Sequence, residues 1–155
     1  VERKSSSDAG RIQRLGVLTS GFLYVQLILG AIVRHRGELV EWHMGFAFIV
    51  AIHVVLLANR ICRQHANLPT LARSAALLRG LLLMQLSLGF ATYLAKFTVS
   101  TPFLTPYLVA LATSHVVVGA LMLVTCIRLT LRAFRFLSAQ QQEFNPQLAS
   151  GSASV

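Results

Sequence analysis

Charged residues are scarce in this chain. Only 12% of its 155 residues are Asp, Glu, Lys or Arg, about half the share of roughly 25% that is usual in soluble globular domains. Four apolar stretches, each close to the roughly 20 residues that a bilayer-spanning helix needs, occupy more than half of the sequence. We therefore expect a polytopic membrane protein, and the composition excludes a separate catalytic or nucleotide-binding domain.

The chain also has few cysteines, and its apolar stretches have few carboxylates. The chain has only two cysteines, Cys62 and Cys126, which excludes a secreted disulfide scaffold, and we predict no disulfide between them. No Asp or Glu lies in the middle of an apolar stretch. A proton-coupled exporter needs a buried carboxylate to exchange protons for its substrate, so this class is disfavoured.

The basic residues predict the orientation in the membrane. Spans are expected at 15–33, 42–58, 75–95 and 104–127, and the first exceeds a signal-peptide core, which indicates a retained helix. The net charge of +9 comes from residues at the ends of these spans, so it does not indicate nucleic-acid binding. Eleven basic residues lie on the side of the termini: Arg3, Lys4, Arg11, Arg14, Arg60, Arg63, Arg73, Arg79, Arg128, Arg132 and Arg135. The other side has Arg34, Arg36 and Lys96, so the termini are predicted to be cytoplasmic.

The predicted fold is therefore an all-α membrane protein, a four-transmembrane-helix bundle. Residues 1–14 are expected to form a cytoplasmic tail, residues 15–135 the membrane domain, and residues 136–155 a disordered cytoplasmic tail, because that last segment has too little apolar content to pack.

An internal repeat divides the membrane domain into two similar halves. The first span contains Gln-Leu-Ile-Leu-Gly at 26–30 and the third contains Gln-Leu-Ser-Leu-Gly at 85–89. The helix after each of these carries a His followed four residues later by a small residue, His43 with Ala47 and His115 with Gly119. We infer a duplicated two-helix unit, with a pseudo-twofold axis along the membrane normal.

The histidines are the candidate functional residues of the spans. An intramembrane His can simply be hydrogen-bonded in the core, but two in repeat-equivalent positions favour a pair of axial ligands to a haem iron within a four-helix bundle. Helix rise places His115 between His43 and His53 in depth, so depth leaves the partner open, whereas the repeat favours His43. For His53 we expect a hydrogen-bonded packing role.

Several neighbours of the histidines have two interpretations. Gly30 and Gly89 either allow close helix packing or make room for the porphyrin. Gln26 and Gln85 either form plain interhelical hydrogen bonds, which we favour, or orient a ligating imidazole.

The outer loop at 34–41 is dense in charge. Arg34 and Arg36 are candidates to pair with haem propionates. Glu41 is a candidate catalytic carboxylate, although a Glu at a helix N-terminus is also favourable for the helix dipole alone.

The run from Gln26 to His35, followed by Glu41-Trp-His43, Gln85 to Gly89 and Ser114-His115, resembles the heme A synthase family of cytochrome oxidase assembly proteins. Members usually contain eight helices in two similar halves, and each half places a His pair on its second and fourth helices. The resemblance implies that His43 and His115 ligate a haem, and that the reaction is oxidation of the heme O methyl group to the formyl group of heme A with the aid of a b-type haem.

This chain spans one such half and lacks the cysteine pair that many members carry in the first outer loop. Two haems would then require a homodimer or a second membrane subunit, and we expect an integral protein of a bacterial or archaeal plasma membrane. A small b-type cytochrome that takes electrons from quinol and a non-catalytic haem chaperone or assembly subunit remain the alternatives.

Overall fold

Four long α-helices make up the fold of the computed structural model, which describes residues 2–64, 68–97 and 105–151, with side chains for 9–64, 68–96 and 106–135. They are α1 (Glu2–Arg36), α2 (Val40–Gln64), α3 (Pro69–Phe97) and α4 (Thr105–Gly151). Each contains a segment long and apolar enough to cross a membrane: Ala9–Arg36, Val40–Gln64, Pro69–Lys96 and Pro106–Arg135. The prediction of an all-helical protein with four membrane-spanning helices is confirmed.

The helices extend beyond the predicted spans. Helix α1 begins at Glu2, within the predicted tail, and α4 continues to Gly151, through most of the segment for which composition predicted disorder. Gln, Glu, Leu and Ala dominate much of that segment and are good helix formers. Low apolar content argues against packing of such a segment, but it does not prevent a helix from continuing.

A tight turn joins α1 to α2. Gly37 has a φ of 74°, the left-handed conformation that commonly ends a helix, and its N–H donates to the Val33 carbonyl at 3.1 Å. Leu39 is also left-handed, with a φ of 62°, which is strained for a residue with a Cβ. Its carbonyl accepts from the N–H of His43 at 2.9 Å, so this turn fixes the position of His43 along α2.

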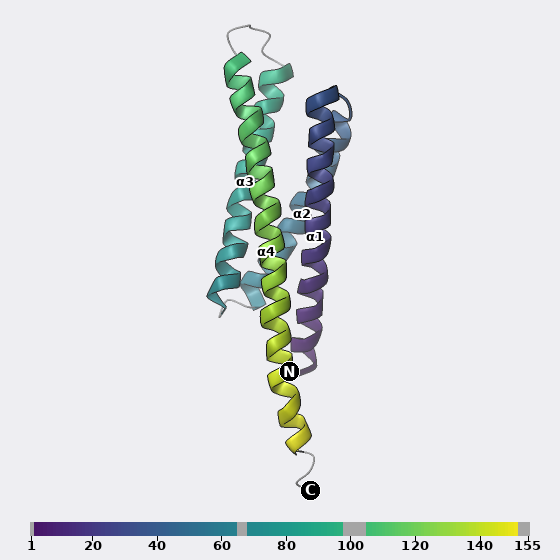
Figure 1. The fold of residues 1–155 in the computed structure, drawn as a ribbon, viewed down its shortest axis with the longest axis vertical. Coiled ribbons are helices and arrows are strands. Elements are labelled where there is room, and N and C mark those ends of the chain that lie inside the picture. Colours follow the sequence, from purple (N-terminus) through teal and green to yellow (C-terminus); the bar gives the residue numbers. More distant parts are fainter. Residues whose placement is uncertain (1, 65–67, 98–104, 152–155) are drawn as a thin grey trace.

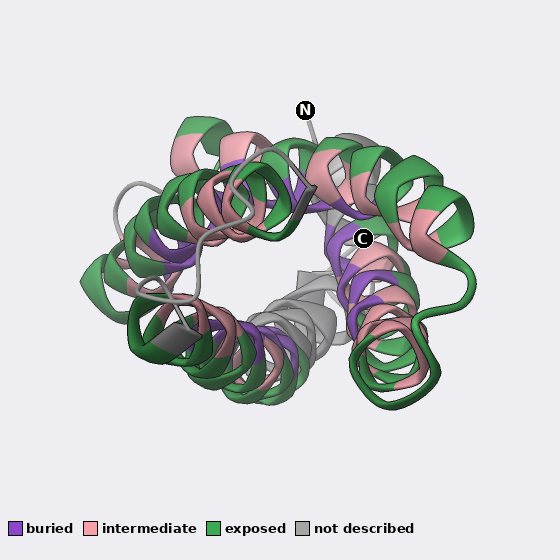
Figure 2. Ribbon diagram, turned by 90° about the horizontal axis from the view of Figure 1, so that it is seen from above, coloured by how far each residue is buried: buried purple, intermediate pink, exposed green. Residues whose placement is uncertain are grey.

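The helices form a ring. Helices α1 and α3 each contact both α2 and α4, and Figure 2 shows the four helices around a common centre. Consequently α2 and α4 face each other diagonally. Helix α1 begins and α4 ends at the same end of the bundle (Figure 1).

Along the length of the bundle, the packed core occupies only one half. We call it the terminal half because it contains the start of α1 and the end of α4. Its buried side chains include Ile12, Leu57, Leu78, Met122 and Leu129. In the other half, the distal half, no residue is buried at 24–49, 83–96 or 106–117 of the described chain. Many apolar side chains point outward, such as Phe48 (71% exposed) and Leu83 (68% exposed), as expected for surfaces that face lipid.

Candidate cofactor site

Gly30 forms a notch for the His43 imidazole where α1 meets α2. A Cβ placed on Gly30 would lie only 3.1 Å from Cε1 of His43, which is closer than ordinary van der Waals contact. The absence of a side chain at position 30 therefore lets the ring of His43 lie directly against the backbone of α1.

The same contact occurs between α3 and α4. A Cβ on Gly89 would lie 3.0 Å from Cε1 of His115. The two motifs that the repeat relates therefore each place one imidazole against one glycine, where a Cβ would lie 3.1 and 3.0 Å from Cε1 and 3.7 and 3.5 Å from Nδ1.

The two imidazoles approach each other across the ring. Their centroids are 6.3 Å apart and their planes make an angle of 77°. Because His43 is on α2 and His115 on α4, the pair joins the diagonally opposed helices within the distal half. Depth along the helices left the partner of His115 open, and the structure brings His43, not His53, next to it.

His53 lies elsewhere on α2. Its Nδ1 donates to the Ile49 carbonyl at 2.8 Å, and its ring packs edge-on against Phe22 with centroids 4.7 Å apart. These contacts agree with the predicted packing role for this residue.

The two glutamines make interhelical hydrogen bonds, but with different partners. Gln26 donates from Nε2 to the main-chain carbonyl of His43 at 2.9 Å, so it positions the backbone of α2. Gln85 brings its Nε2 within 3.3 Å of Nε2 of His115 and therefore contacts the ring itself. Gly119 makes room for this amide, since a Cβ there would lie 3.1 Å from Nε2 of Gln85.

Polar atoms around the histidine pair lack hydrogen-bond partners. Nδ1 of His43, Nδ1 of His115 and Oε1 of both glutamines are buried without a partner among the described residues. Leaving such groups unpaired in an apolar interior costs free energy, and native structures rarely leave several of them together. The four unpartnered atoms lie around one pair of imidazoles and leave hydrogen-bonding or ligating capacity unused there.

The site offers the two imidazoles of His43 and His115 as candidate metal ligands. Within the described ranges, no group of three or more His, Cys, Asp or Glu side chains is close enough together to hold a metal ion. A zinc site built by one chain normally has at least three protein ligands. A haem iron needs only axial ligands from the protein, because the porphyrin supplies the other four.

The candidate arginines of the outer loop lie in the last turn of α1. Arg34 is one helical turn beyond Gly30 and on the same face of α1, whereas Arg36 is directed away from that face. Both side chains are exposed. Arg34 is therefore better placed than Arg36 to reach a group bound between the histidines.

Glu41 does not lie beside the histidine pair. It is two positions before His43, which is about 200° around the helix. Its side chain instead lines an open cavity of about 390 Å³ together with Trp42, Gly45, Phe46 and Ile49.

The sequence interpretation missed one cluster of side chains. Arg73, Arg128 and Arg132 were attributed to orientation in the membrane, but they line a pocket between α3 and α4. The signal was present in the sequence, because Arg128 and Arg132 are four residues apart on one helix face with no acidic residue nearby.

Fold and site together define the chain as a multi-pass, four-helix membrane protein with an inward-facing histidine pair. Comparison with protein-family models, with curated proteins and with solved structures finds no match for the chain.

Proposed function

We propose that the chain binds a haem between His43 and His115, with one imidazole on each side of the iron. The observation that carries this proposal is the separation of 6.3 Å between the two ring centroids. An imidazole nitrogen bonds a metal ion at ~2 Å and lies roughly 1 Å from its ring centre, so two axial imidazoles on one ion have centres ~6 Å apart. The pair is thus already spaced for one iron.

The packing of the bundle supports the same proposal. Protein interiors are normally filled to high density by their own side chains, yet no described residue of the distal half is buried. A porphyrin is a large apolar plate that would bury partly exposed side chains of this half, and its iron would give the unpartnered imidazole nitrogens a partner. Gly30 and Gly89 let the two rings lie close to the backbones of α1 and α3.

The protein residues would hold the group in distinct ways. His43 and His115 would ligate the iron, and Arg34, with Arg36 as a weaker contributor, would pair with propionates at the outer surface. When bound, the haem supplies a one-electron iron couple whose potential depends on the axial ligands and on burial.

We further propose that the chain acts in heme A biosynthesis and cytochrome oxidase assembly, in line with the motifs it shares with heme A synthases. Conversion of a methyl group to a formyl group takes up one water and releases four protons and four electrons, so it requires an electron acceptor and a second, substrate haem. Glu41 lines a separate cavity and is the proposed catalytic carboxylate that acts on the substrate haem.

The two equivalent glycine–histidine contacts support the proposed duplication of a two-helix unit. The excess of basic residues at the terminal end supports a cytoplasmic location of both termini. A bacterial or archaeal plasma membrane follows from the resemblance to heme A synthases alone.

A second candidate is a b-type cytochrome that transfers electrons from quinol. It is favoured by one specific observation, namely that the described bundle brings together a single histidine pair and places Glu41 away from it. Electron transfer needs one haem, whereas oxidation of a substrate haem needs two sites.

The ligand assignment is tested by replacing each histidine. His43→Ala and His115→Ala should each abolish the low-spin absorption spectrum of the purified protein, because each removes one axial ligand. His53→Ala should leave the spectrum largely intact, since His53 is bonded to Ile49 and lies against Phe22. Pigment extraction with haem analysis identifies the haem type in the same samples. Loss of the spectrum in His53→Ala but not in His43→Ala would overturn the assignment.

A further inference from the structure

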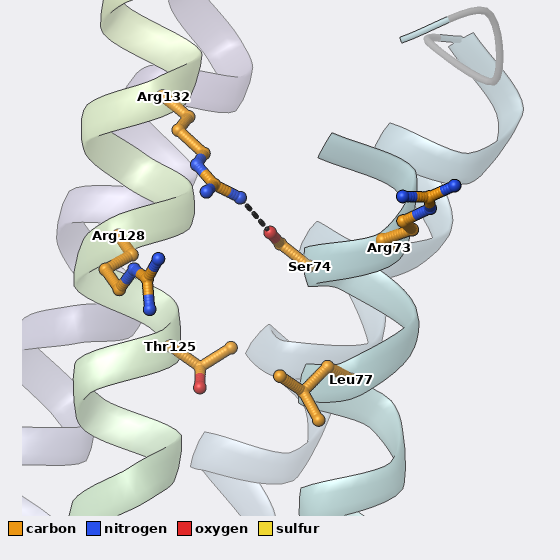
Figure 3. Close-up of a pocket in the computed structure, with 6 residues that line it drawn as sticks. All are labelled: Arg73, Ser74, Leu77, Thr125, Arg128 and Arg132. Carbon is orange, nitrogen blue, oxygen red and sulfur yellow. Dashed lines mark hydrogen bonds between the residues drawn. The ribbon is translucent and has the colours of Figure 1, made fainter. Parts of the chain in front are cut away.

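A basic pocket lies between α3 and α4 in the terminal half, remote from the histidine pair. It has a volume of about 170 Å³ and is lined by Arg73, Ser74 and Leu77 of α3 and by Thr125, Arg128 and Arg132 of α4. Figure 3 shows Arg132 reaching across from α4 to Ser74, with Arg73 on the far side of that serine.

The pocket gathers positive charge, and no carboxylate among the described side chains lies beside it. Arg132 donates to the Ser74 hydroxyl at 2.9 Å and to the Thr70 carbonyl at 3.4 Å, and both acceptors are neutral. Among the described side chains, the only carboxylates are Glu38 and Glu41, which belong to the opposite end of the bundle. Three arginines thus line one small pocket, with Arg128 and Arg132 on α4 and Arg73 on the far side of Ser74, and like charges so arranged favour binding of an anion.

The position of the pocket indicates what kind of anion it receives. Arg73 and Leu77 lie four and eight residues after the start of α3, or ~6–12 Å along its axis, which corresponds to the headgroup layer and the edge of the hydrocarbon core. Leu77 is 55% exposed, and Leu121 and Val124 of α4 are 50% and 52% exposed. An apolar surface thus continues from the arginines toward the membrane centre.

We propose that this pocket binds the headgroup phosphate of an anionic membrane phospholipid, whose acyl chains lie along the exposed apolar side chains of α3 and α4. Arginine is suited to this role because its planar guanidinium can donate two parallel hydrogen bonds to phosphate oxygens. Basic pockets between transmembrane helices are recurrent sites for anionic headgroups. A free phosphate ion would use the arginines but gain nothing from the apolar surface, so the geometry favours the lipid.

The test uses the full chain purified in a neutral detergent. Phosphatidylglycerol and phosphatidylcholine with identical acyl chains are added in separate titrations, and bound lipid is counted by native mass spectrometry. We expect one tightly bound phosphatidylglycerol, preferred over phosphatidylcholine by about 150-fold, from roughly 1 kcal/mol for each of the three arginines. Arg128→Gln should weaken phosphatidylglycerol binding about fivefold, and Arg128→Gln combined with Arg132→Gln about 30-fold, on the same basis.

Arg79→Gln is the matched control, because Arg79 is an exposed arginine of α3 that does not line the pocket, and it should bind phosphatidylglycerol like the wild type. Equal binding of the two lipids by the wild-type protein would overturn the proposal, and this comparison needs no variant to fold. An equal loss in Arg79→Gln and Arg128→Gln would overturn it as well. Displacement of the lipid by inorganic phosphate at the same concentration would show that the site binds the phosphate ion and would overturn the assignment to a lipid.

Discussion

Gly30 and Gly89 control how close the two imidazoles lie to the neighbouring helices. A methyl group at either position would stand 3.1 or 3.0 Å from a ring carbon, so the imidazole would have to move by a few tenths of an ångström. Such crowding typically costs about 1–3 kcal/mol. The helix itself would tolerate the change, because alanine is a better helix former than glycine.

The first prediction follows from this geometry. Gly30→Ala and Gly89→Ala should each weaken haem binding by about 5- to 150-fold, the equivalent of the crowding cost, while the helical content stays unchanged. Absorbance titration of the purified protein with haemin measures the affinity, and circular dichroism measures the helix.

Gly21 and Gly80 provide matched controls for these variants. Each lies on the same helix as its test position, and a Cβ on either would meet nothing within 4 Å. Gly21→Ala and Gly80→Ala should therefore bind haem like the wild type. If Gly30→Ala binds haemin as tightly as Gly21→Ala, the notch does not position a ligand.

Arg34 and Arg36 give the second prediction for single residues. Because Arg34 continues the face of α1 that carries Gly30 and Arg36 does not, Arg34→Gln should weaken haemin binding a few-fold and Arg36→Gln should have less effect, as expected for ion pairs at an exposed surface. The dimethyl ester of haemin, which lacks the propionate charges, is the control ligand. An equal loss with the ester in Arg34→Gln would show that the arginine acts through something other than a propionate.

At the scale of the helices, α1 and α4 contact each other in the terminal half through small and polar residues. Gly16 faces Thr130, whose hydroxyl donates to the Cys126 carbonyl at 2.8 Å. Ser20 places its hydroxyl 3.4 Å from the sulfur of Cys126. Small residues of this kind let transmembrane helices approach closely and associate by van der Waals contact.

The third prediction concerns this contact. A Cβ on Gly16 would lie 2.6 Å from Oγ1 of Thr130, so Gly16→Ala forces α1 and α4 apart and should lower the free energy of unfolding by about 1–3 kcal/mol. Thermal unfolding in detergent measures this change. Cys126, which is fully buried, should also react faster with a maleimide in the variant than in the wild type.

Gly21→Ala serves again as the control for Gly16→Ala, because it adds the same methyl group to the same helix without a contact. Identical unfolding temperatures and identical labelling of Cys126 in the two variants would show that this helix contact does not limit stability.

The four spans could be predicted from the sequence because their signal is length and apolar content. Neither property depends on how the helices pack against one another. The pairing of His43 with His115 could be predicted only through the repeat. Depth along the helix did not decide it, because the start of each helix was uncertain by about one turn, or ~5 Å. The different roles of Gln26 and Gln85 could not be predicted, since they depend on side-chain positions within an otherwise similar repeat.

At the scale of the whole molecule, the two halves of the bundle differ in packing. The terminal half has a core of buried apolar side chains, whereas the distal half has no buried residue in the described ranges 24–49, 83–96 and 106–117. The sequence does not predict this difference, because the spans are apolar on most of their faces and hydropathy alone does not separate the lipid-facing side from the interior. In the proposed function, the haem completes the core of the distal half.

The last prediction depends on the number of haem sites. One bundle brings together one histidine pair, and oxidation of a substrate haem needs a second binding site. We therefore expect heme A formation only when a second four-helix unit is present, supplied by a second copy of this chain or by another membrane subunit. Glu41→Gln should lower the yield of heme A without removing the haem between His43 and His115, because Glu41 faces a different cavity.

Expression in a host that supplies heme O, followed by extraction and chromatography of the haems, measures heme A for the wild type and for Glu41→Gln, and light scattering gives the oligomeric state of each sample. The absorption spectrum of the histidine pair is the internal control, since it should be the same in both proteins. Equal heme A from both proteins would exclude Glu41 from the reaction, and abundant heme A from a verified monomer would contradict the need for a second unit. An intact spectrum with no heme A from either protein would instead favour the b-type cytochrome, because a single ligated haem is sufficient to transfer electrons.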